Sequence, residues 1–266
     1  SSLPSVVTIH DAVPFRYPDP DPNRRHHAQE PFLRSARTAS RVIAVSNFGR
    51  AELETLLAIP RGKIEVILHG VDASFVPGPA VPLPGALRER PYLLFVGDPI
   101  AEPRKNFALL YEAYRRAWPQ FDGPILAVLG PRAPQLDGVV GLGNLGDDLV
   151  AGQNEALRAC YRGAMALTLA SYHETFGMPL LEAMACGTAV IASRAGSLPE
   201  VGADAPLYAP PDDADAWAAT LRAVAADAAL RERLRAAGLK RAKAFSWDES
   251  SRRHLAVFTD VRRQRD

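Results

Sequence analysis

The sequence predicts an α/β protein of two domains, each built on a parallel sheet with helices on its faces. Short apolar segments rich in branched residues alternate with amphipathic helical segments along nearly all of the 266 residues. This alternation is typical of βα units, which form parallel sheets. A stretch at 76–91 holds five prolines, and the alternation restarts after it. We therefore expect a linker at 76–90 between the two domains.

The sequence pattern of residues 1–75 predicts an incomplete first domain. Its expected elements, in chain order, are a strand at 5–11, a proline- and aspartate-rich loop at 14–23, a helix at 31–40, a strand at 41–46, a helix at 47–58 and a strand at 63–72. Ser46 stands where a serine oxygen can cap the second helix. A doubly wound domain normally carries about six strands, so about three strands make this domain partial.

Residues 91–245 predict a complete doubly wound domain. Its expected elements are strands at 92–97, 124–130, 164–170 and 188–193, a short glycine-rich apolar segment at 138–146, and helices at 106–118, 154–164, from about 179, and at 215–244 with a break near Asp227. Pro179 favours a helix start and Gly187 a helix end. Residues 246–266 indicate a final helix with a basic end.

Composition excludes several classes of protein. With 47% hydrophobic residues, 23% charged residues and a net charge of +1, no charge field indicates a nucleic-acid partner. No apolar run approaches the roughly 20 residues that cross a bilayer. Cys160 and Cys186 lie in apolar helical patterns, which favours two core thiols in a reducing compartment and leaves a single bridge open. We expect a cytoplasmic protein, with contact of the basic tail to an anionic inner membrane face as the alternative.

The segment 171–187 is the most informative part of the chain. It places Glu174 in a loop after a strand and Glu182 in the expected first turn of the next helix. Free backbone N–H groups at a helix start bind anions, and a carboxylate can accept hydrogen bonds from two vicinal hydroxyls. A ligand with a diphosphate and several hydroxyls, such as a nucleotide sugar, suits this arrangement. The alternative for Glu182 is that an acid in a first turn complements the helix dipole.

Two cations follow the strand at 92–97. Arg104 and Lys105 lie in the loop at 97–106, at the carboxyl end of a parallel strand, where ligands bind in doubly wound sheets. Both side chains suit a diphosphate. Gly97 would permit a close approach of the ligand to the backbone. The alternative is that the two cations are solvated charges at a helix start.

Two segments of the chain resemble the retaining nucleotide-sugar glycosyltransferases of the glycogen-synthase-like class, family four. They read "ETFGMPLLEAMACGTAVIAS" and "GSLPEVGADAPLYAPPDDADAWAATL". The resemblance runs through nearly all of the chain. It implies a GT-B-like fold, in which two Rossmann-like domains face a cleft and the first domain begins well upstream of the His-Asp pair at 10–11. By this resemblance, 1–75 is the tail of the acceptor-side domain, 91–245 is the nucleotide-sugar domain, and 246–266 crosses back to the first domain.

The resemblance also implies roles for single residues. Glu182 would bind the nucleotide ribose, Glu174 would lie beside the donor sugar, and His10 would face that sugar across the cleft. Backbone N–H groups at Thr175, Phe176 and Gly177 would meet the sugar or the phosphates, although the Phe176 ring itself is expected in the core.

The diphosphate-binding cations depart from the family pattern at one position. In the family an arginine follows the glycine directly, and a lysine several residues later completes the pair. Here Asp98 follows Gly97 and has the opposite charge. We expect Lys105 to keep the lysine's role and Arg104 to replace the missing arginine.

These observations predict a retaining, hexosyltransferase-like glycosyltransferase. It would move a sugar from a nucleotide diphosphate sugar to a hydroxyl acceptor, which could be a saccharide, a lipid-linked group or a small molecule. No DxD-like metal site is evident, so we expect neither a metal ion nor another cofactor. A dehydrogenase is a weaker interpretation, because the G-x-G-x-x-G at 141–146 belongs to the glycine-rich segment at 138–146 and does not open a helix, the next expected helix beginning at 154.

The rival hypothesis is a non-catalytic nucleotide-sugar-binding subunit or fragment. The partial first domain would leave an apolar edge at 6–10 without a neighbouring strand, and such an edge invites pairing. We therefore expect the isolated chain to be a poor catalyst, and a second chain that completes the first domain to be a candidate partner.

Overall fold

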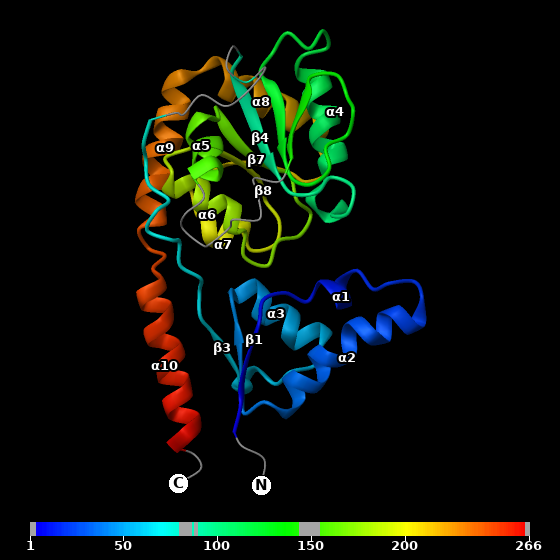
Figure 1. Ribbon diagram of the computed structural model, residues 1–266, viewed down its shortest axis with the longest axis vertical. Helices are drawn as coiled ribbons and strands as arrows, with labels where there is room; N and C mark the ends of the chain where they lie inside the picture. The colour runs from blue at the N-terminus through cyan, green and yellow to red at the C-terminus, as the bar shows by residue number, and fades with distance from the viewer. Residues whose placement is uncertain (1–3, 80–86, 88–89, 144–154, 264–266) are drawn as a thin grey trace. The chain divides into compact units, whose positions relative to one another are not determined.

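Figure 1 shows the computed structural model, which divides into two compact units. The structure describes residues 4–79, 87, 90–143 and 155–263. The first unit consists of residues 1–70 with 245–266, and the second unit of residues 71–244. Most of the linker expected at 76–90 lies outside the described residues.

The first unit is built on parallel strands in the order β1-β2-β3. β1 (Val6–Ile9) pairs with β2 (Arg41–Ala44), and β2 pairs with β3 (Ile64–Val66). Residues 42–44 of the central strand are fully buried. A strand covered on both faces is apolar throughout, which explains why the sequence showed a continuous run here instead of an alternation. Among the described residues, β1 has a strand partner on one side only.

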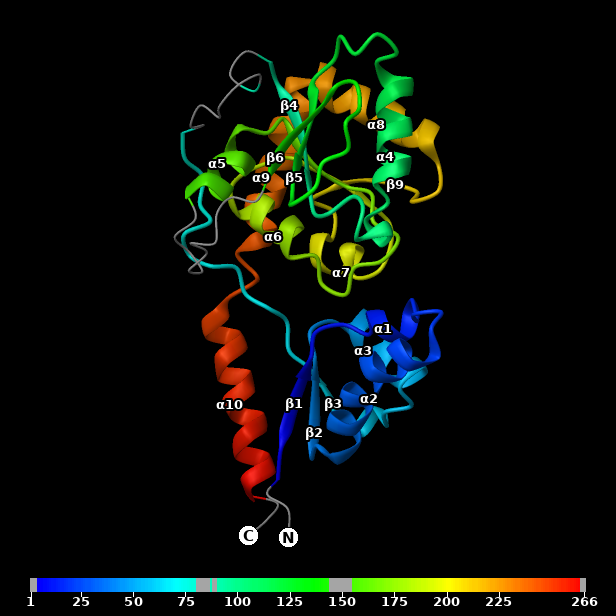
Figure 2. The ribbon, with the colours of Figure 1, turned by 45° about the vertical axis from the view of Figure 1, so that its right-hand side comes forward.

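Helices cover both faces of this small sheet. Figure 2 shows α2 and α3 on one face and α10 on the other. The helices of the first unit are α1 (Val13–Arg16), α2 (Pro22–Thr38), α3 (Asn47–Leu56) and α10 (Trp247–Arg263), with a 3-10 turn at Arg61–Lys63. The Ser46 hydroxyl accepts a hydrogen bond of 2.9 Å from the Gly49 N–H, which confirms the predicted cap of α3.

The loop and helix expected at 14–40 differ from the structure. α2 begins at Pro22, nine residues earlier than predicted, and it continues through Pro31. The Asp21 carboxylate caps its start by accepting a hydrogen bond of 2.9 Å from the Asn23 N–H, and Pro22 occupies the favourable first position. Prolines favour loop structure in this stretch, but the favourable cap and the following polar helix formers outweigh one lost hydrogen bond at Pro31.

The second unit contains a six-stranded, fully parallel sheet in the order β6-β5-β4-β7-β8-β9. Numbered within the unit, this is 3-2-1-4-5-6, the order of a doubly wound fold, and its switch point lies between β4 and β7. The strands are β4 (Tyr92–Val96), β5 (Ile125–Leu129), β6 (Val139–Gly143), β7 (Ala166–Leu169), β8 (Val190–Ser193) and β9 (Leu207–Ala209). The predicted doubly wound domain is thereby confirmed.

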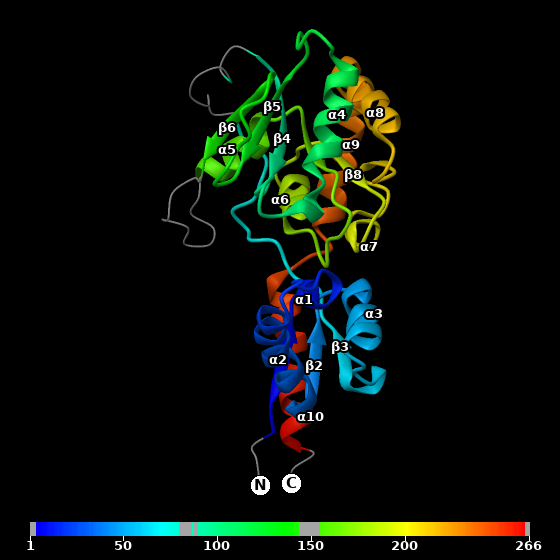
Figure 3. The same ribbon diagram turned by 90° about the vertical axis from the view of Figure 1, so that its right-hand side faces the viewer.

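Helices lie on both faces of the large sheet. α4 and α8 pack together over one face, and α5 and α6 lie over the other (Figure 3). The helices are α4 (Phe107–Ala117), α5 (Glu155–Gly163), α6 (Met178–Ala185), α7 (Leu198–Gly202), α8 (Ala214–Ala226) and α9 (Ala228–Ala242). The predicted break falls at Asp227, whose carboxylate caps α9 through the Leu230 N–H.

The core of the second unit is formed where α4 and α8 meet the sheet. Leu93, Leu126, Tyr114 and Trp217 are fully buried there. The Trp217 indole N–H donates to the Pro210 carbonyl at 2.8 Å, so burying this polar atom leaves no hydrogen bond unmade. Among the described residues, no helix is both long and apolar enough to span a membrane.

Both cysteines are buried free thiols, so the single bridge left open by the sequence is absent. Burial raises the pKa of Cys160 to about 11 and that of Cys186 to about 12. Both therefore remain protonated near neutral pH and act as small apolar residues of the core.

Candidate functional site

The predicted site residues of the second unit gather at the switch point of the large sheet. β4 is followed by the loop 97–106 and β7 by the loop 170–177. Because β4 and β7 are neighbouring parallel strands, their carboxyl ends lie at the same edge. The Tyr172 N–H donates to the Arg104 carbonyl at 2.8 Å, and the Asn106 amide donates to the Ala170 carbonyl at 3.0 Å. These bonds fix one loop against the other.

Glu174 is the centre of this arrangement. The residue is buried, and its Oε1 accepts a hydrogen bond of 2.9 Å from the Ser171 hydroxyl. Lys105 Nζ lies 3.4 Å from the same oxygen, and Arg104 Nη1 lies 3.5 Å from Oε2. Two cations from the loop after β4 therefore converge on one carboxylate from the loop after β7.

The loop after β8 holds the backbone of Glu174. The Ser197 N–H and the Ser197 hydroxyl each donate to the Glu174 carbonyl at 2.9 Å. Gly196 has φ +58°, and a side-chain carbon there would overlap the carbonyl oxygen of Glu174. Gly196 and Ser197 thus determine where Glu174 lies. Sequence analysis assigned neither residue a role, since their contact depends on the adjacency of β7 and β8.

The stem of Lys105 packs directly against Gly97. The lysine residue is only 7% exposed, and a side-chain carbon at Gly97, whose φ is +141°, would overlap the aliphatic stem of Lys105. The glycine therefore makes room for the lysine. The predicted close approach of a ligand to Gly97 stays a prediction.

Arg104 is engaged by a second acid. Its Nη2 lies 2.6 Å from Glu102 Oε1, in addition to the contact with Glu174. Glu102 Oε2 in turn accepts a hydrogen bond of 3.1 Å from the Asp98 N–H. The expected replacement of the missing arginine by Arg104 would therefore require Arg104 to share its charge with two carboxylates.

Asp98 is paired with an arginine from the loop that follows β5. Asp98 Oδ2 lies 2.8 Å from Arg132 Nε and 2.7 Å from Arg132 Nη2, while Oδ1 accepts hydrogen bonds of 2.9 Å from the N–H groups of Ile100 and Ala101. The Ala101 hydrogen bond above all, with help from Ile100 and Arg132, holds the pKa of Asp98 below its usual value. Asp98 is therefore an ionised, paired group.

The position of Glu182 differs from the prediction. α6 begins at Met178, so Glu182 is its fifth residue and lies in the second turn instead of the first. Gly177, with φ +89°, adopts the left-handed conformation that lets the helix begin directly after the loop. Because dipole effects fade beyond the first turn, the alternative interpretation of Glu182 as a dipole-complementing acid loses its basis.

The Glu182 carboxylate is partly buried beside a tyrosine. Its Oε2 accepts a hydrogen bond of 2.7 Å from the hydroxyl of Tyr161, a fully buried residue of α5. Burial raises the pKa of Glu182, while the Tyr161 hydrogen bond and the charge of Lys105 act in the opposite direction. Burial and the Glu182 charge raise the pKa of Tyr161 well above its usual range, so its hydroxyl stays a donor.

Thr175, Phe176 and Gly177 complete the loop. Thr175 and Phe176 are buried, and the Phe176 ring contributes to the core as expected. A side-chain carbon at Gly177 would come within 2.7 Å of the Leu198 side chain, so the loop packs tightly against α7.

His10 belongs to the first unit, apart from the other predicted site residues. It is exposed at the end of β1, and its Nδ1 lies 3.2 Å from His69 Nε2, with the two rings stacked at 5.2 Å. Burial, together with His10 and His254, lowers the pKa of His69 to about 4, so His69 is neutral near pH 7. The neighbouring Asp11 accepts a hydrogen bond of 3.0 Å from the Val13 N–H and caps the turn.

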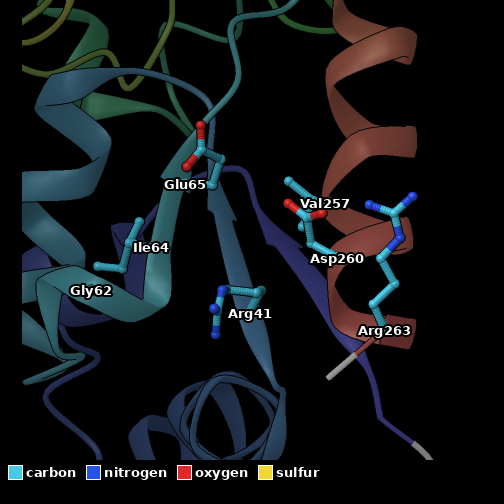
Figure 4. Close-up of a pocket in the computed structure, with 7 residues that line it drawn as sticks. All are labelled: Arg41, Gly62, Ile64, Glu65, Val257, Asp260 and Arg263. Atoms are coloured by element: carbon cyan, nitrogen blue, oxygen red, sulfur yellow. The ribbon is translucent and has the colours of Figure 1, made fainter. Parts of the chain in front are cut away.

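The first unit also has two hollows. One, of about 340 Å³, lies between α10 and the strands β2 and β3, and its side chains are shown in Figure 4. It combines Arg41 and Arg263 with Glu65 and Asp260, and it contains no predicted site residue. The other, of about 420 Å³, lies beside β1 and includes His10 with Val7 and Phe32. In the part of the chain that the structure describes, no three His, Cys, Asp or Glu side chains gather in a way that could hold a metal ion.

Two protein families match this chain. Residues 84–241 match the family "Glycosyl transferases group 1", and residues 1–75 match "Glycosyltransferase Family 4". The O-antigen chain mannosyltransferase B of Escherichia coli is 31% identical over 96% of this chain and 70% of its own length. A D-inositol 3-phosphate glycosyltransferase of Kribbella flavida is 30% identical over 97% of this chain and 66% of its own length. The chain thus spans about two thirds of the length of these relatives.

Solved structures share the fold. Sucrose-phosphate synthase from Thermosynechococcus elongatus superposes with a TM-score of 0.70 at 24% identity, over 96% of this chain and 67% of that one. Anabaena HepE, in complex with UDP and glucose, has a TM-score of 0.74 at 17% identity, over 96% and 71% of the two chains. The fold is therefore GT-B-like, as expected, with a complete doubly wound unit and a smaller parallel unit.

Proposed function

The chain belongs to the group 1 family of glycosyltransferases, and from this premise we propose that it transfers a sugar from a nucleotide diphosphate sugar to a hydroxyl acceptor with retention at the anomeric carbon. The observation that carries the proposal is the convergence of Arg104 and Lys105 on Glu174 at the switch point of the doubly wound sheet. Ligands of such sheets bind at this point.

Binding of the donor redistributes charge among these three residues. A nucleoside diphosphate brings its own negative charges, which compete with Glu174 for Lys105 and Arg104. As the cations turn toward the diphosphate, the Glu174 carboxylate becomes available to accept hydrogen bonds from the donor sugar. The Ser171 hydroxyl, 2.9 Å from Glu174 Oε1, supports the carboxylate in this position.

Glu182 binds the ribose in this proposal. The Tyr161 hydroxyl orients the carboxylate through Oε2, so its acceptor capacity is directed by the fold before the nucleotide arrives. A preorganised acceptor avoids the cost of ordering a side chain during binding.

The reaction itself is a heterolysis. The bond between the anomeric carbon and the diphosphate oxygen breaks, its electron pair leaves with the diphosphate, and Lys105 and Arg104 stabilise the developing charge. The acceptor oxygen bonds to the anomeric carbon on the same face, and its proton passes to a diphosphate oxygen. His10 faces the donor sugar during this step. The cations of the chain supply the stabilisation, so the proposal includes no metal ion or other cofactor.

Within this proposal, residues 1–75 serve as the acceptor-side domain, 76–90 as a linker, 91–245 as the donor domain and 246–266 as a helix of the first domain. Two buried free thiols are consistent with a reducing compartment, so we place the protein in the cytoplasm. Peripheral contact of its basic end with an anionic membrane face is the further option.

The second candidate function is a nucleotide-sugar-binding subunit that needs a partner chain. It is favoured by β1, which among the described residues has β2 on one side only, beside the apolar hollow lined by Val7 and Phe32. A separate chain with an added strand would complete the sheet and the acceptor side.

One experiment distinguishes the two candidates. The full chain is incubated with UDP- and GDP-linked glucose and mannose and a panel of hydroxyl acceptors, and donor binding and sugar transfer are measured separately. The transferase proposal predicts transfer with retained anomeric configuration in the product, read by NMR. Binding without transfer supports the subunit, and no binding of any nucleotide sugar overturns both.

A further inference from the structure

We propose that Arg132 is a diphosphate-binding residue of this site and that Asp98 holds it there. The inference rests on the proposed function, because it names a residue that would meet the donor's diphosphate. Sequence analysis assigned Arg132 no role.

Arg132 lies at the same sheet edge as Lys105. It follows β5 by three residues, and β5 is the parallel neighbour of β4. The Gly97 N–H donates to the Leu129 carbonyl at 2.9 Å, and a side-chain carbon at Gly130 would overlap the Gly97 carbonyl. The backbone before Arg132 therefore touches the backbone at Gly97, next to which the stem of Lys105 packs.

The pair of Asp98 and Arg132 is asymmetric in a way that suits ligand binding. The Asp98 side chain is 9% exposed, and two backbone N–H groups fix its Oδ1. The Arg132 side chain is 51% exposed, although two of its guanidinium nitrogens contact Asp98 Oδ2. A guanidinium has five N–H donors, so an arginine held by one carboxylate oxygen can still bind a second anion. The Asp98 carboxylate fixes the position of the pair, and the Arg132 guanidinium is its accessible group.

The other two cations of the site are less exposed, and both contact Glu174. Arg104 contacts both Glu102 and Glu174, with a side chain 23% exposed, and Lys105 contacts Glu174 with a side chain 9% exposed. Arg132 is the most accessible of the three. It also cancels the charge of Asp98, which would otherwise repel a diphosphate beside Gly97.

The test compares affinities for a nucleoside diphosphate and for the matching nucleoside, measured by calorimetry on the full chain. We compare the wild type with Arg132→Ala, with the double variant Asp98→Asn/Arg132→Ala, with Lys105→Ala as the reference for the proposed diphosphate site, and with Arg116→Ala as the matched control. Asparagine keeps an acceptor for the Ile100 and Ala101 N–H groups without the charge. Arg116 is an exposed arginine of α4 whose partners are Glu112 and Asp215.

Arg132→Ala should weaken diphosphate binding about ten- to a hundredfold, the scale of hydrogen bonds to charged groups, and leave nucleoside binding almost unchanged. The double variant should recover part of the loss, because the unpaired acid is gone, and remain below the wild type. The control should bind like the wild type.

Two results would overturn the inference while the proposed function stands. In the first, Arg132→Ala binds the diphosphate like the wild type although Lys105→Ala does not. In the second, the double variant returns fully to wild-type affinity, which would mean that Arg132 only screens Asp98. If the wild type binds no nucleoside diphosphate, both the inference and the proposed function fail. Melting curves of all variants report whether each one is folded.

Discussion

At the residue scale, burial and the proposed function of Glu182 favour opposite protonation states. Burial favours the protonated carboxyl, whereas ribose binding uses the ionised carboxylate. The Glu182 carboxylate is held beside Tyr161 in a position where burial raises its pKa. A raised pKa means that the fold favours the protonated form, so the ionised form costs stability as pH rises from the ordinary pKa of a glutamate through the raised one.

Glu182→Gln should therefore weaken nucleoside binding about ten- to a hundredfold, since the amide lacks the charge that strengthens hydrogen bonds to hydroxyls. The melting temperature at pH 7 should stay the same or rise, because the cost of burying a charge is removed. In the wild type, nucleoside affinity should fall on acidification, beginning at a higher pH than for an exposed glutamate. Glu112→Gln, at an exposed acid of α4, is the control. A sharp drop in melting temperature with unchanged binding would show that Glu182 is structural.

At the same scale, the pair of Asp98 and Arg132 marks a limit of reasoning from sequence. Asp98 could be identified as a departure from the family pattern, because it directly follows Gly97. Its partner, Arg132, lies 34 residues later in the chain, and the sequence around Arg132 does not indicate the contact. Their proximity follows from the adjacency of β4 and β5, which only the sheet order establishes.

At the element scale, the site depends on loops that follow neighbouring strands. The sequence predicted the strands before these loops because buried parallel strands are apolar runs. Pro179 predicts a helix start one residue too late, because Gly177 occupies the N-cap position and Met178 begins the helix, so Glu182 is its fifth residue and not its fourth. The sequence did not indicate α2 before residue 31, since the Asp21 cap is a local signal within a proline-rich stretch.

The contact of Gly196 with Glu174 gives a prediction about elements. Gly196→Ala would force a methyl group against the Glu174 carbonyl and impose a positive φ on alanine, so the variant should be less stable by about 1–3 kcal/mol. Relative to the wild type, the variant should lose more affinity for a nucleotide sugar than for the matching nucleoside diphosphate, because Glu174 would shift away from the sugar. Gly62→Ala is the control, since a side-chain carbon there meets nothing within 4 Å. Chemical denaturation and calorimetry measure the two effects; wild-type behaviour in both would refute the positioning role.

At the scale of the whole molecule, we expect the first unit to limit the rate of sugar transfer. Among the described residues β1 is an edge strand, and the chain covers about two thirds of the length of its relatives. We expect the isolated chain to bind a donor but to transfer sugar slowly, since an acceptor side in which β1 has a single strand neighbour would admit water to the reacting centre. Turnover measured with the best-binding donor checks this, with Glu174→Gln to show that any residual activity belongs to this protein. Fast transfer by the monomer would contradict the expectation.

The central claim is that the second unit binds a nucleoside diphosphate at its switch point through Lys105. Calorimetric titration of the full chain with UDP, GDP, ADP and dTDP, and with the corresponding nucleosides, tests it most directly when wild type and Lys105→Ala are compared. The account predicts that at least one diphosphate binds and that Lys105→Ala weakens its binding about ten- to a hundredfold while nucleoside binding changes little. Absence of binding for all four diphosphates, or equal losses for nucleoside and diphosphate, would contradict it.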